Sequence, residues 1–241
     1  RMELIVASVI VLLAASIHAC TGFGFSVLAT PFLLLVYPPS EAIQINIALS
    51  ILISVVLMPK LVADVDRPLL WRLIWGSLLG APVGIAIYIF ANPEHLRLGI
   101  GLLLLGFTFL ILRDFRFRRS GGRDVLTGGL SGALTSGLGM PGPPLMVSFA
   151  GSTLSPATLR STTLVCFLVT YSISLLLQVV AGSSSLDVLR AALLLTPATA
   201  AGVVIGQVLF RRIDAGSFMK LLYGLLILTG AYLVIGAVWP G

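Results

Sequence analysis

Apolar residues fill most of the chain in long runs, which short charged or Gly/Pro-containing breaks separate. The runs are about 17 to 25 residues long, and an α-helix needs about 20 to cross roughly 30 Å of hydrocarbon. Membrane β-strands would instead give runs of about ten residues with alternating polarity. We therefore predict an all-α integral membrane protein. The expected helices cover 3–20, 24–37, 41–61, 68–91, 95–112, 125–137, 142–151, 156–181, 186–210 and 216–238.

Three of these helices have explicit start signals. Ser40, Asn92 and Ser155 each precede a glutamate or a proline, which are residues favoured in the first helical turn. We expect these three side chains to be N-caps.

Two apolar stretches, 3–37 and 125–151, are too long for one helix and contain a break. The first is interrupted by Thr21-Gly22-Phe23-Gly24, with Pro31 beyond it, and the second by the glycine- and proline-rich residues 136–144. Each stretch is therefore either a broken helix or a helical hairpin.

Loop charge favours the hairpins. If both stretches return to their starting side and the basic loop 113–124 is cytoplasmic, only Arg1, Arg97 and Arg190 of the 15 basic residues lie outside. Single crossings would place five outside: Arg97, Arg160, Arg211, Arg212 and Lys220. The hairpin model predicts both termini outside, with a first membrane repeat (1–112), a basic cytoplasmic linker (113–124) and a second membrane repeat (125–241).

The two halves align with each other. An offset of 115 residues, from Gly24 to Gly139, superimposes the two glycine motifs, and Gly80 and Gly84 correspond to Gly202 and Gly206. With an odd net number of crossings in each half, the halves have opposite orientations. Each would consist of a Gly/Pro-broken hairpin and three transmembrane helices, and such inverted repeats are typical of secondary transporters.

The second glycine motif carries a resemblance to a known family. The run from Ser136 to Leu145 (SGLGMPGPPL), then Leu159 to Thr162 (LRST), with a degenerate glycine motif at 21–24, resembles the TauE/SafE sulfite exporter family over essentially the whole chain. The resemblance implies a multi-pass inner-membrane permease for small sulfur-containing anions such as sulfite, sulfoacetate or other organosulfonates. This chain departs from the usual glycine-dense pattern at Met140-Pro141 and has Phe25-Ser26 in the first half.

The breaks are the predicted substrate site. Glycine and proline at membrane depth leave irregular backbone that only a protein-lined cavity accommodates, and helix N-termini near Phe25 and Gly142 would favour an anion. Tight helix packing is the alternative explanation for these glycines. The candidate substrate-binding residues are Thr21, Gly22, Phe23, Gly24, Ser26, Asn46, Ser50, Ser136, Gly137, Gly139, Met140, Pro141, Gly142, Arg160 and Thr163.

Several candidates have two interpretations. Polar residues in 41–61 (Gln44, Asn46, Ser50, Ser54) and in 156–181 (Thr163, Thr170, Ser174, Gln178) either line the path or bond neighbouring helices. Arg160 is either an anion-attracting residue at the cytoplasmic mouth or a positive-inside anchor. His18 is either a packing histidine or a proton relay, and His95 is expected at the surface.

Other functions find little support in the sequence. The net charge of +6 comes from arginines at the ends of apolar runs and not from a basic face, so we expect no nucleic-acid partner. All nine acidic residues lie near segment ends, and the two cysteines lie in apolar runs, so we expect no metal, no cofactor and no enzyme. A non-transporting scaffold remains the alternative, and a homo-oligomer is possible. Residues 3–19 before Cys20 also fit a signal peptide with a lipoprotein-like cleavage site.

Overall fold

The computed structural model describes residues 2–21, 24–60, 62–113, 120–149, 152–181, 185–209, 224 and 227–236. All regular structure in these ranges is helical, as predicted. The elements are α1 (Met2–Thr21), α2 (Phe25–Leu33), α3 (Pro39–Leu57), two 3₁₀ turns (Met58–Lys60 and Val62–Asp64), α4 (Arg67–Phe90), α5 (Pro93–Leu112), α6 (Gly121–Leu138), α7 (Gly142–Phe149), α8 (Pro156–Val180) and α9 (Leu186–Leu209), with a short apolar helix at Ile227–Gly236.

Six of the described helices are long and apolar enough to cross a membrane, namely α1, α3, α4, α5, α8 and α9. Large apolar side chains are exposed on their outer faces, as α4 illustrates with Trp71, Leu79 and Phe90. A water-soluble protein rarely exposes so continuous an apolar surface, whereas lipid accommodates it. The fold is therefore that of a multi-pass membrane protein.

The helix starts confirm two of the three predicted caps. The Ser155 hydroxyl accepts from the Thr158 amide at 3.1 Å, and Asn92 Oδ1 accepts from the His95 amide at 3.0 Å. The prediction for Ser40 is wrong. Because the fixed φ of Pro39 suits a first helical position, α3 begins at Pro39, and its N-cap is Pro38 without a side-chain cap.

Other predicted boundaries in the described ranges lie within four residues of the observed ones, and the helix predicted at 41–61 ends at Leu57. The start predicted at residue 216 lies outside the described residues. Two further differences of four residues have clear causes. The helix expected to run to residue 37 ends at Leu33, because the chain turns at 34–37 ahead of Pro38. Helix α6 begins at Gly121, inside the predicted linker 113–124 and four residues before the apolar run. It begins there because Ser120 caps it by accepting from the Arg123 amide.

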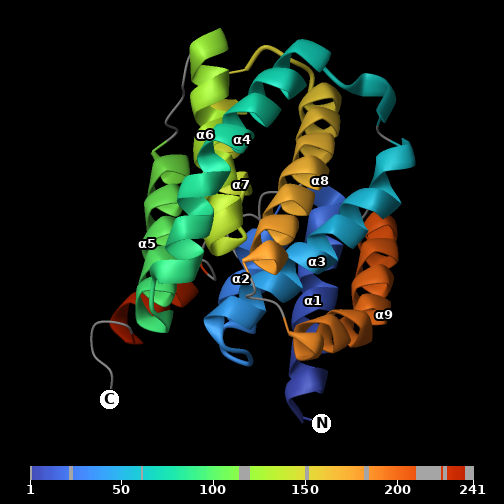
Figure 1. Cartoon of the computed structure of the whole chain (residues 1–241). Coiled ribbons are helices and arrows are strands. Elements are labelled where there is room, and N and C mark those ends of the chain that lie inside the picture. The colour runs from blue at the N-terminus through green and yellow to red at the C-terminus, as the bar shows by residue number, and fades with distance from the viewer. Residues whose placement is uncertain are drawn as a thin grey trace.

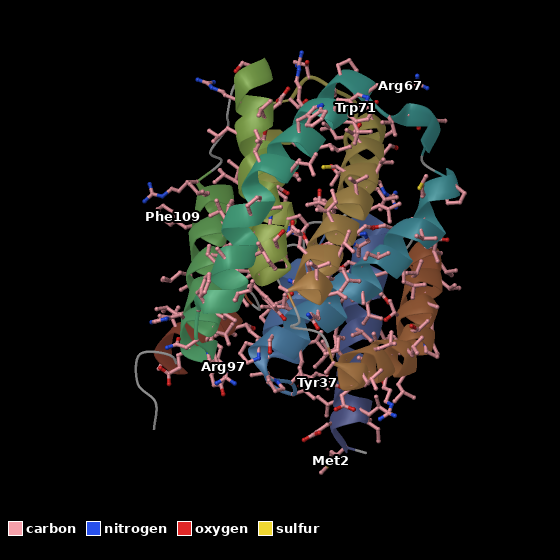
Figure 2. All side chains as sticks on the ribbon, in the orientation of Figure 1. Met2, Tyr37, Arg67, Trp71, Arg97 and Phe109 are labelled. Atoms are coloured by element: carbon pink, nitrogen blue, oxygen red, sulfur yellow. The ribbon has the colours of Figure 1, made fainter. Side chains whose placement is uncertain are left out.

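The helices run between two ends of the molecule. In Figure 1, α1, α3, α5 and α9 begin at the lower end and α4, α6 and α8 at the upper end. Figure 2 places Met2 and Tyr37 together at the lower end, so the stretch containing α1 and α2 returns to its starting side. Burial and the nearby carboxylates of Glu3 and Glu41 raise the pKa of Tyr37. Because Glu3 is in the first turn of α1 and Glu41 in the first turn of α3, both helices start near this turn.

The most extensive helix contacts join elements far apart in the sequence. Helix α4 packs along α6, α1 packs along α9, and α3 contacts α8. Glycines make these crossings close. A Cβ at Gly80 would overlap the Gly129 carbonyl of α6, and a Cβ at Gly206 would overlap the Ser16 carbonyl of α1. The backbones therefore touch directly, as small residues allow in membrane helix pairs.

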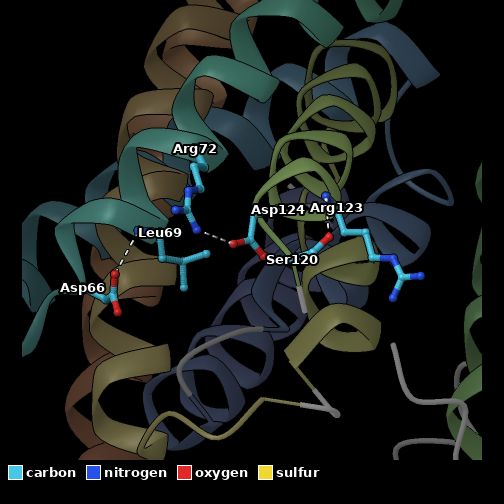
Figure 3. A network of polar contacts seen from close by, with 6 residues as sticks. All are labelled: Asp66, Leu69, Arg72, Ser120, Arg123 and Asp124. Atoms are coloured by element: carbon cyan, nitrogen blue, oxygen red, sulfur yellow. Dashed lines mark hydrogen bonds and ion pairs between the residues drawn. The ribbon is translucent and has the colours of Figure 1, made fainter. Parts of the chain in front are cut away.

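Charged and polar contacts fasten the upper end of α4 to its neighbours (Figure 3). Asp66 caps α4 by accepting from the Leu69 amide at 2.8 Å, and Arg72 lies 3.4 Å from Asp124 of α6. The Asp66 amide also donates to Thr162 of α8 at 3.0 Å. Asp124 lies near a helix end, as all acidic residues were expected to, yet it is buried.

Candidate functional site

The two breaks share an unusual backbone conformation. Gly24, with φ of 110°, and Gly139, with φ of 70°, are the positive-φ glycines of the described residues. L-residues with a Cβ rarely adopt this region, so glycine is required at both turns. These are the two positions that the 115-residue offset superimposes.

Each break leads into a short helix that is buried in protein. Helix α2 has nine residues and α7 has eight, about 14 and 12 Å at 1.5 Å per residue, so neither spans a bilayer. Both are enclosed by the longer helices, and almost every residue from Ser136 to Ser148 is buried. Irregular backbone at membrane depth is tolerated in such a setting.

The short helices contact each other inside the molecule. A Cβ on Gly142, the first residue of α7, would lie 3.7 Å from the Val27 side chain of α2 and 4.0 Å from Phe167 of α8. Helix α3 also contacts α2 and α8. The start of α2, the start of α7 and the middle of the α3–α8 pair thus form one central region.

Amide side chains hold the second break in place. Asn46 Nδ2 donates to the Gly139 carbonyl at 2.8 Å, and Gln178 Nε2 donates to the Ser136 carbonyl at 3.0 Å. Both carbonyls belong to the C-terminal end of α6, where helix geometry leaves them without intrahelical donors. Ser136 also bonds the Ser174 hydroxyl at 2.8 Å, and Ser131 donates to the Pro141 carbonyl at 2.8 Å.

The first break is held by a histidine and an arginine. His18 Nδ1 accepts from the Phe25 amide at 3.3 Å, so the ring bridges the end of α1 and the start of α2. Arg160 Nη2 donates to the Ala19 carbonyl at 2.9 Å. Arg160 therefore contacts the first break, a role that neither the mouth nor the anchor interpretation of this residue includes.

A third group of polar residues lies between α2, α3 and α8. Tyr171, Ser26 and Ser50 lie close together, and all three residues are buried. Thr30 lies one turn beyond Ser26 on α2 and is fully buried. Hydroxyls therefore continue along α2 beyond the first break.

Both predicted polar stripes face the interior. Gln44, Asn46, Ser50 and Ser54 of α3 and Thr163, Thr170, Ser174 and Gln178 of α8 are all buried. Bonds to other helices use Asn46, Ser174 and Gln178, whereas Thr170 bonds the Cys166 carbonyl of its own helix at 2.8 Å. The interhelical explanation therefore accounts for several of them.

Some buried polar atoms have no partner among the described residues. They are His18 Nε2, Thr30 Oγ1, Asn46 Oδ1, Ser50 Oγ, Arg160 Nε, Ser161 Oγ and Gln178 Oε1. Native interiors leave few such atoms, and each asks for an explanation such as an unseen water, ion or ligand. All of them lie on α1, α2, α3 and α8.

The structure separates the predicted site residues into groups. Gly24, Ser26, Asn46, Ser50, Ser136, Gly139, Met140, Pro141, Gly142, Arg160 and Thr163 lie at the breaks or on α3 and α8, and Gly22, Phe23 and the Thr21 side chain lie outside the described residues. Gly137 serves packing, because a Cβ there would lie 3.1 Å from the Gly84 carbonyl. For this glycine the packing alternative holds.

Sequence reasoning left out four polar residues of this region, Thr30, Ser131, Ser161 and Tyr171. Thr30 had a signal, because it follows Ser26 by four residues and shares its helix face. Ser161 stands beside Arg160 in the family-like run. Ser131 and Tyr171 had none, since single hydroxyls in apolar helices are common.

In the described ranges, no group of three His, Cys, Asp or Glu residues is placed to hold a metal ion.

Three comparisons with known proteins bear on identity. Neither the curated proteins nor the solved structures contain a significant match. The family model described as sulfite exporter TauE/SafE matches residues 7–233, nearly the whole chain, and this protein therefore belongs to the TauE/SafE sulfite exporter family.

Proposed function

We propose that this protein is an inner-membrane permease that moves small sulfur-containing anions, such as sulfite, sulfoacetate or related organosulfonates. Membership of a transporter family and six apolar spans support transport across a bilayer. The observation that carries the proposal is the meeting of the two breaks in the protein interior, with Gly142 of α7 beside Val27 of α2. The substrate would bind between them.

Alternating access between the halves is part of the proposal. Under the sequence alignment of the halves, α1 corresponds to α6, α3 to α8 and α4 to α9, and the members of each pair run in opposite directions in Figure 1. The packing of α1 on α9 and of α4 on α6 is equivalent under the same exchange. An inverted repeat, with both termini extracytoplasmic, explains these pairings, and rocking of one half against the other would expose the breaks alternately.

The chemistry of the breaks suits an anion. The starts of α2 and α7 bring positive helix-dipole ends toward the centre, although Pro143 and Pro144 leave α7 with few free amides, and Arg160 adds a full positive charge at the first break. The buried carboxylate of the described residues, that of Asp124, does not lie at the breaks. It pairs with Arg72 near the start of α4.

Purified protein in liposomes tests the proposal directly. Sulfite, sulfoacetate and a simple organosulfonate should each be assayed for uptake, against empty liposomes and against a neutral sugar. We expect flux above background for at least one sulfur oxyanion and none for the sugar. Flux at the level of empty liposomes for every anion contradicts the proposal.

The glycines of the breaks supply a second test. We expect Gly22→Val, Gly24→Val, Gly137→Val and Gly139→Val to abolish transport while membrane insertion persists. Full activity in all four variants removes the breaks from the mechanism. A stable partner complex whose function survives Gly139 and Asn46 substitutions would instead indicate a scaffold.

A further inference from the structure

Two donors at the first break are buried and unpaired. His18 is 5% exposed, and its Nε2 has no partner among the described residues. The Nε of Arg160 is likewise buried without a partner. Both side chains contact the same turn, because Arg160 donates to Ala19, the residue that follows His18.

The first contact of His18 determines what its second nitrogen can do. The Phe25 amide can only donate, so His18 Nδ1 must be the acceptor of the 3.3 Å bond. In neutral imidazole the proton then lies on Nε2, which becomes a donor with a fixed direction. The backbone thus sets the tautomer and holds the ring at the start of α2.

Arg160 adds the charge. Its guanidinium stays protonated in proteins and offers several donors in one plane, of which Nη2 is engaged with Ala19 at 2.9 Å. Within the described part of the chain it forms no ion pair. The nine-residue helix α2 starts at the same break with a glycine N-cap that has no side-chain oxygen to satisfy the first amides.

We infer that His18 Nε2, the Arg160 guanidinium and the N-terminal end of α2 form an anion subsite that binds the oxyanion head of the transported substrate. The subsite rests on the proposed function, since it adds residues and a ligand class to the same central region. All its free groups are donors, so the ligand must supply acceptors and negative charge. Sulfite and organosulfonates share a head of three oxygens on sulfur, which offers several acceptors to these donors.

A purely structural role makes different demands. Capping the end of α1 requires only the bond from Arg160 to Ala19, and orienting the turn requires only the bond from Phe25 to His18. Neither role uses Nε2 of His18 or Nε of Arg160. Substitutions that keep the structural bonds and remove the free donors therefore separate the two roles.

Binding to detergent-purified full-length protein is measured by titration calorimetry with sodium sulfite and with sodium methanesulfonate. His18→Asn keeps an acceptor near the Nδ1 position and removes the Nε2 donor, whereas His18→Gln restores an N–H donor near Nε2. Arg160→Gln removes the charge and Arg160→Lys keeps it. His95→Asn and Arg97→Gln are matched controls, because both residues are exposed near the start of α5.

We expect the dissociation constant to rise at least about tenfold in His18→Asn and in Arg160→Gln, with smaller losses in His18→Gln and Arg160→Lys and none in the controls. Thermal unfolding of each variant is measured in parallel. If Arg160→Gln does not fold, the ratio between His18→Asn and His18→Gln decides. Binding unchanged in His18→Asn, or equal loss in His18→Asn and His18→Gln, overturns the subsite.

Transport separates this inference from the proposed function. If wild-type protein in liposomes carries anions and folded His18→Asn has an unchanged KM, the subsite is contradicted and the proposed permease function is not. Wild-type protein that binds sulfite with His18 dependence but carries no anion supports the subsite and contradicts the permease. Wild-type protein that neither binds nor carries any sulfur oxyanion overturns both.

Discussion

At the residue scale, single side chains satisfy the backbone that each break exposes. Asn46 and Gln178 donate to carbonyls at the end of α6, and His18 accepts from the first amide of α2. An unpaired backbone group is costly away from water, so the broken geometry depends on these partners. The same residues are therefore needed for stability and are close to the proposed substrate position.

Replacing Asn46 separates these two contributions. Asn46→Leu removes the donor to the Gly139 carbonyl, and we expect it to lower stability by about 1 kcal/mol, a usual value for such bonds between membrane helices. Thermal unfolding in detergent measures this change. Transport is assayed well below the unfolding temperature, where we expect a larger loss than in Gln178→Leu, because Asn46 lies at the turn itself. Equal transport in both variants contradicts a special role for Asn46.

Gly139 tests the requirement for positive φ. Gly139→Ala places a Cβ 3.0 Å from Asn46 Nδ2 in a left-handed conformation, which alone costs about 1–2 kcal/mol. We expect a lower unfolding temperature and reduced transport. Gly106→Ala is the matched control, because a Cβ there meets no atom within 4 Å. A Gly139→Ala variant as stable as Gly106→Ala would show that the turn does not need glycine.

Sequence alone could identify Asn46 and the glycines, since polar and flexible residues stand out in apolar runs. It could not reveal the bond from Arg160 to Ala19, which joins residues 141 positions apart. Nor could it show that Gly137 and Gly139 differ, one packing against Gly84 and the other adopting positive φ. These distinctions depend on tertiary contacts.

At the element scale, glycines spaced by four allow α4 and α6 to touch. Gly76, Gly80 and Gly84 face the carbonyls of Val125, Gly129 and Ala133, and no Cβ fits at any of the three. The α1–α9 pair uses Gly202 and Gly206 against Leu12 and Ser16 in the same way. These crossings fix the long helices that flank each break.

Enlarging one of these glycines should force the helices apart. We expect Gly80→Leu to destabilise the protein by at least about 2 kcal/mol, as overpacking does in tight interiors. Gly202→Leu should have a comparable effect on the α1–α9 pair. Thermal unfolding measures both, with Gly106→Leu as the control on the open side of α5. A Gly80→Leu variant as stable as the control contradicts direct backbone contact.

Element positions were largely predictable because apolar length and capping residues mark them. The end of α2 was not, since the apolar run continues past Leu33 into the turn before Pro38. The partner of each helix was not predictable either. The sequence contained a matching pair of glycines in each half, Gly80 and Gly84 and then Gly202 and Gly206. This match indicated a repeat but did not show which helices contact each other.

At the scale of the whole molecule, charged residues lie at both ends of the structure. Arg67 lies at the upper end of Figure 2, and the ion pair of Arg72 with Asp124 lies near the same end. Arg97 lies at the lower end with Met2 and Tyr37. We expect the upper end to be cytoplasmic, because the basic linker 113–124 precedes α6, which begins at this end, and the positive-inside rule places basic loops in the cytoplasm.

Cysteine labelling tests this topology, and the second break discriminates best. With Cys20 and Cys166 replaced by serine, single cysteines are introduced at four exposed positions: Glu94→Cys, Gly122→Cys, Thr153→Cys and Asp187→Cys. If α6 and α7 form a hairpin, Gly122→Cys and Thr153→Cys lie on the cytoplasmic side and Glu94→Cys and Asp187→Cys lie outside. A membrane-impermeant maleimide added to intact cells should then label only the second pair, and lysis should expose the first.

If the stretch containing α6 and α7 crossed the membrane once, Thr153→Cys would be labelled from outside and Asp187→Cys would be protected. That result would reverse the orientation of α8 and α9 and remove the inverted repeat, and with it the proposal that both breaks open alternately to the two sides.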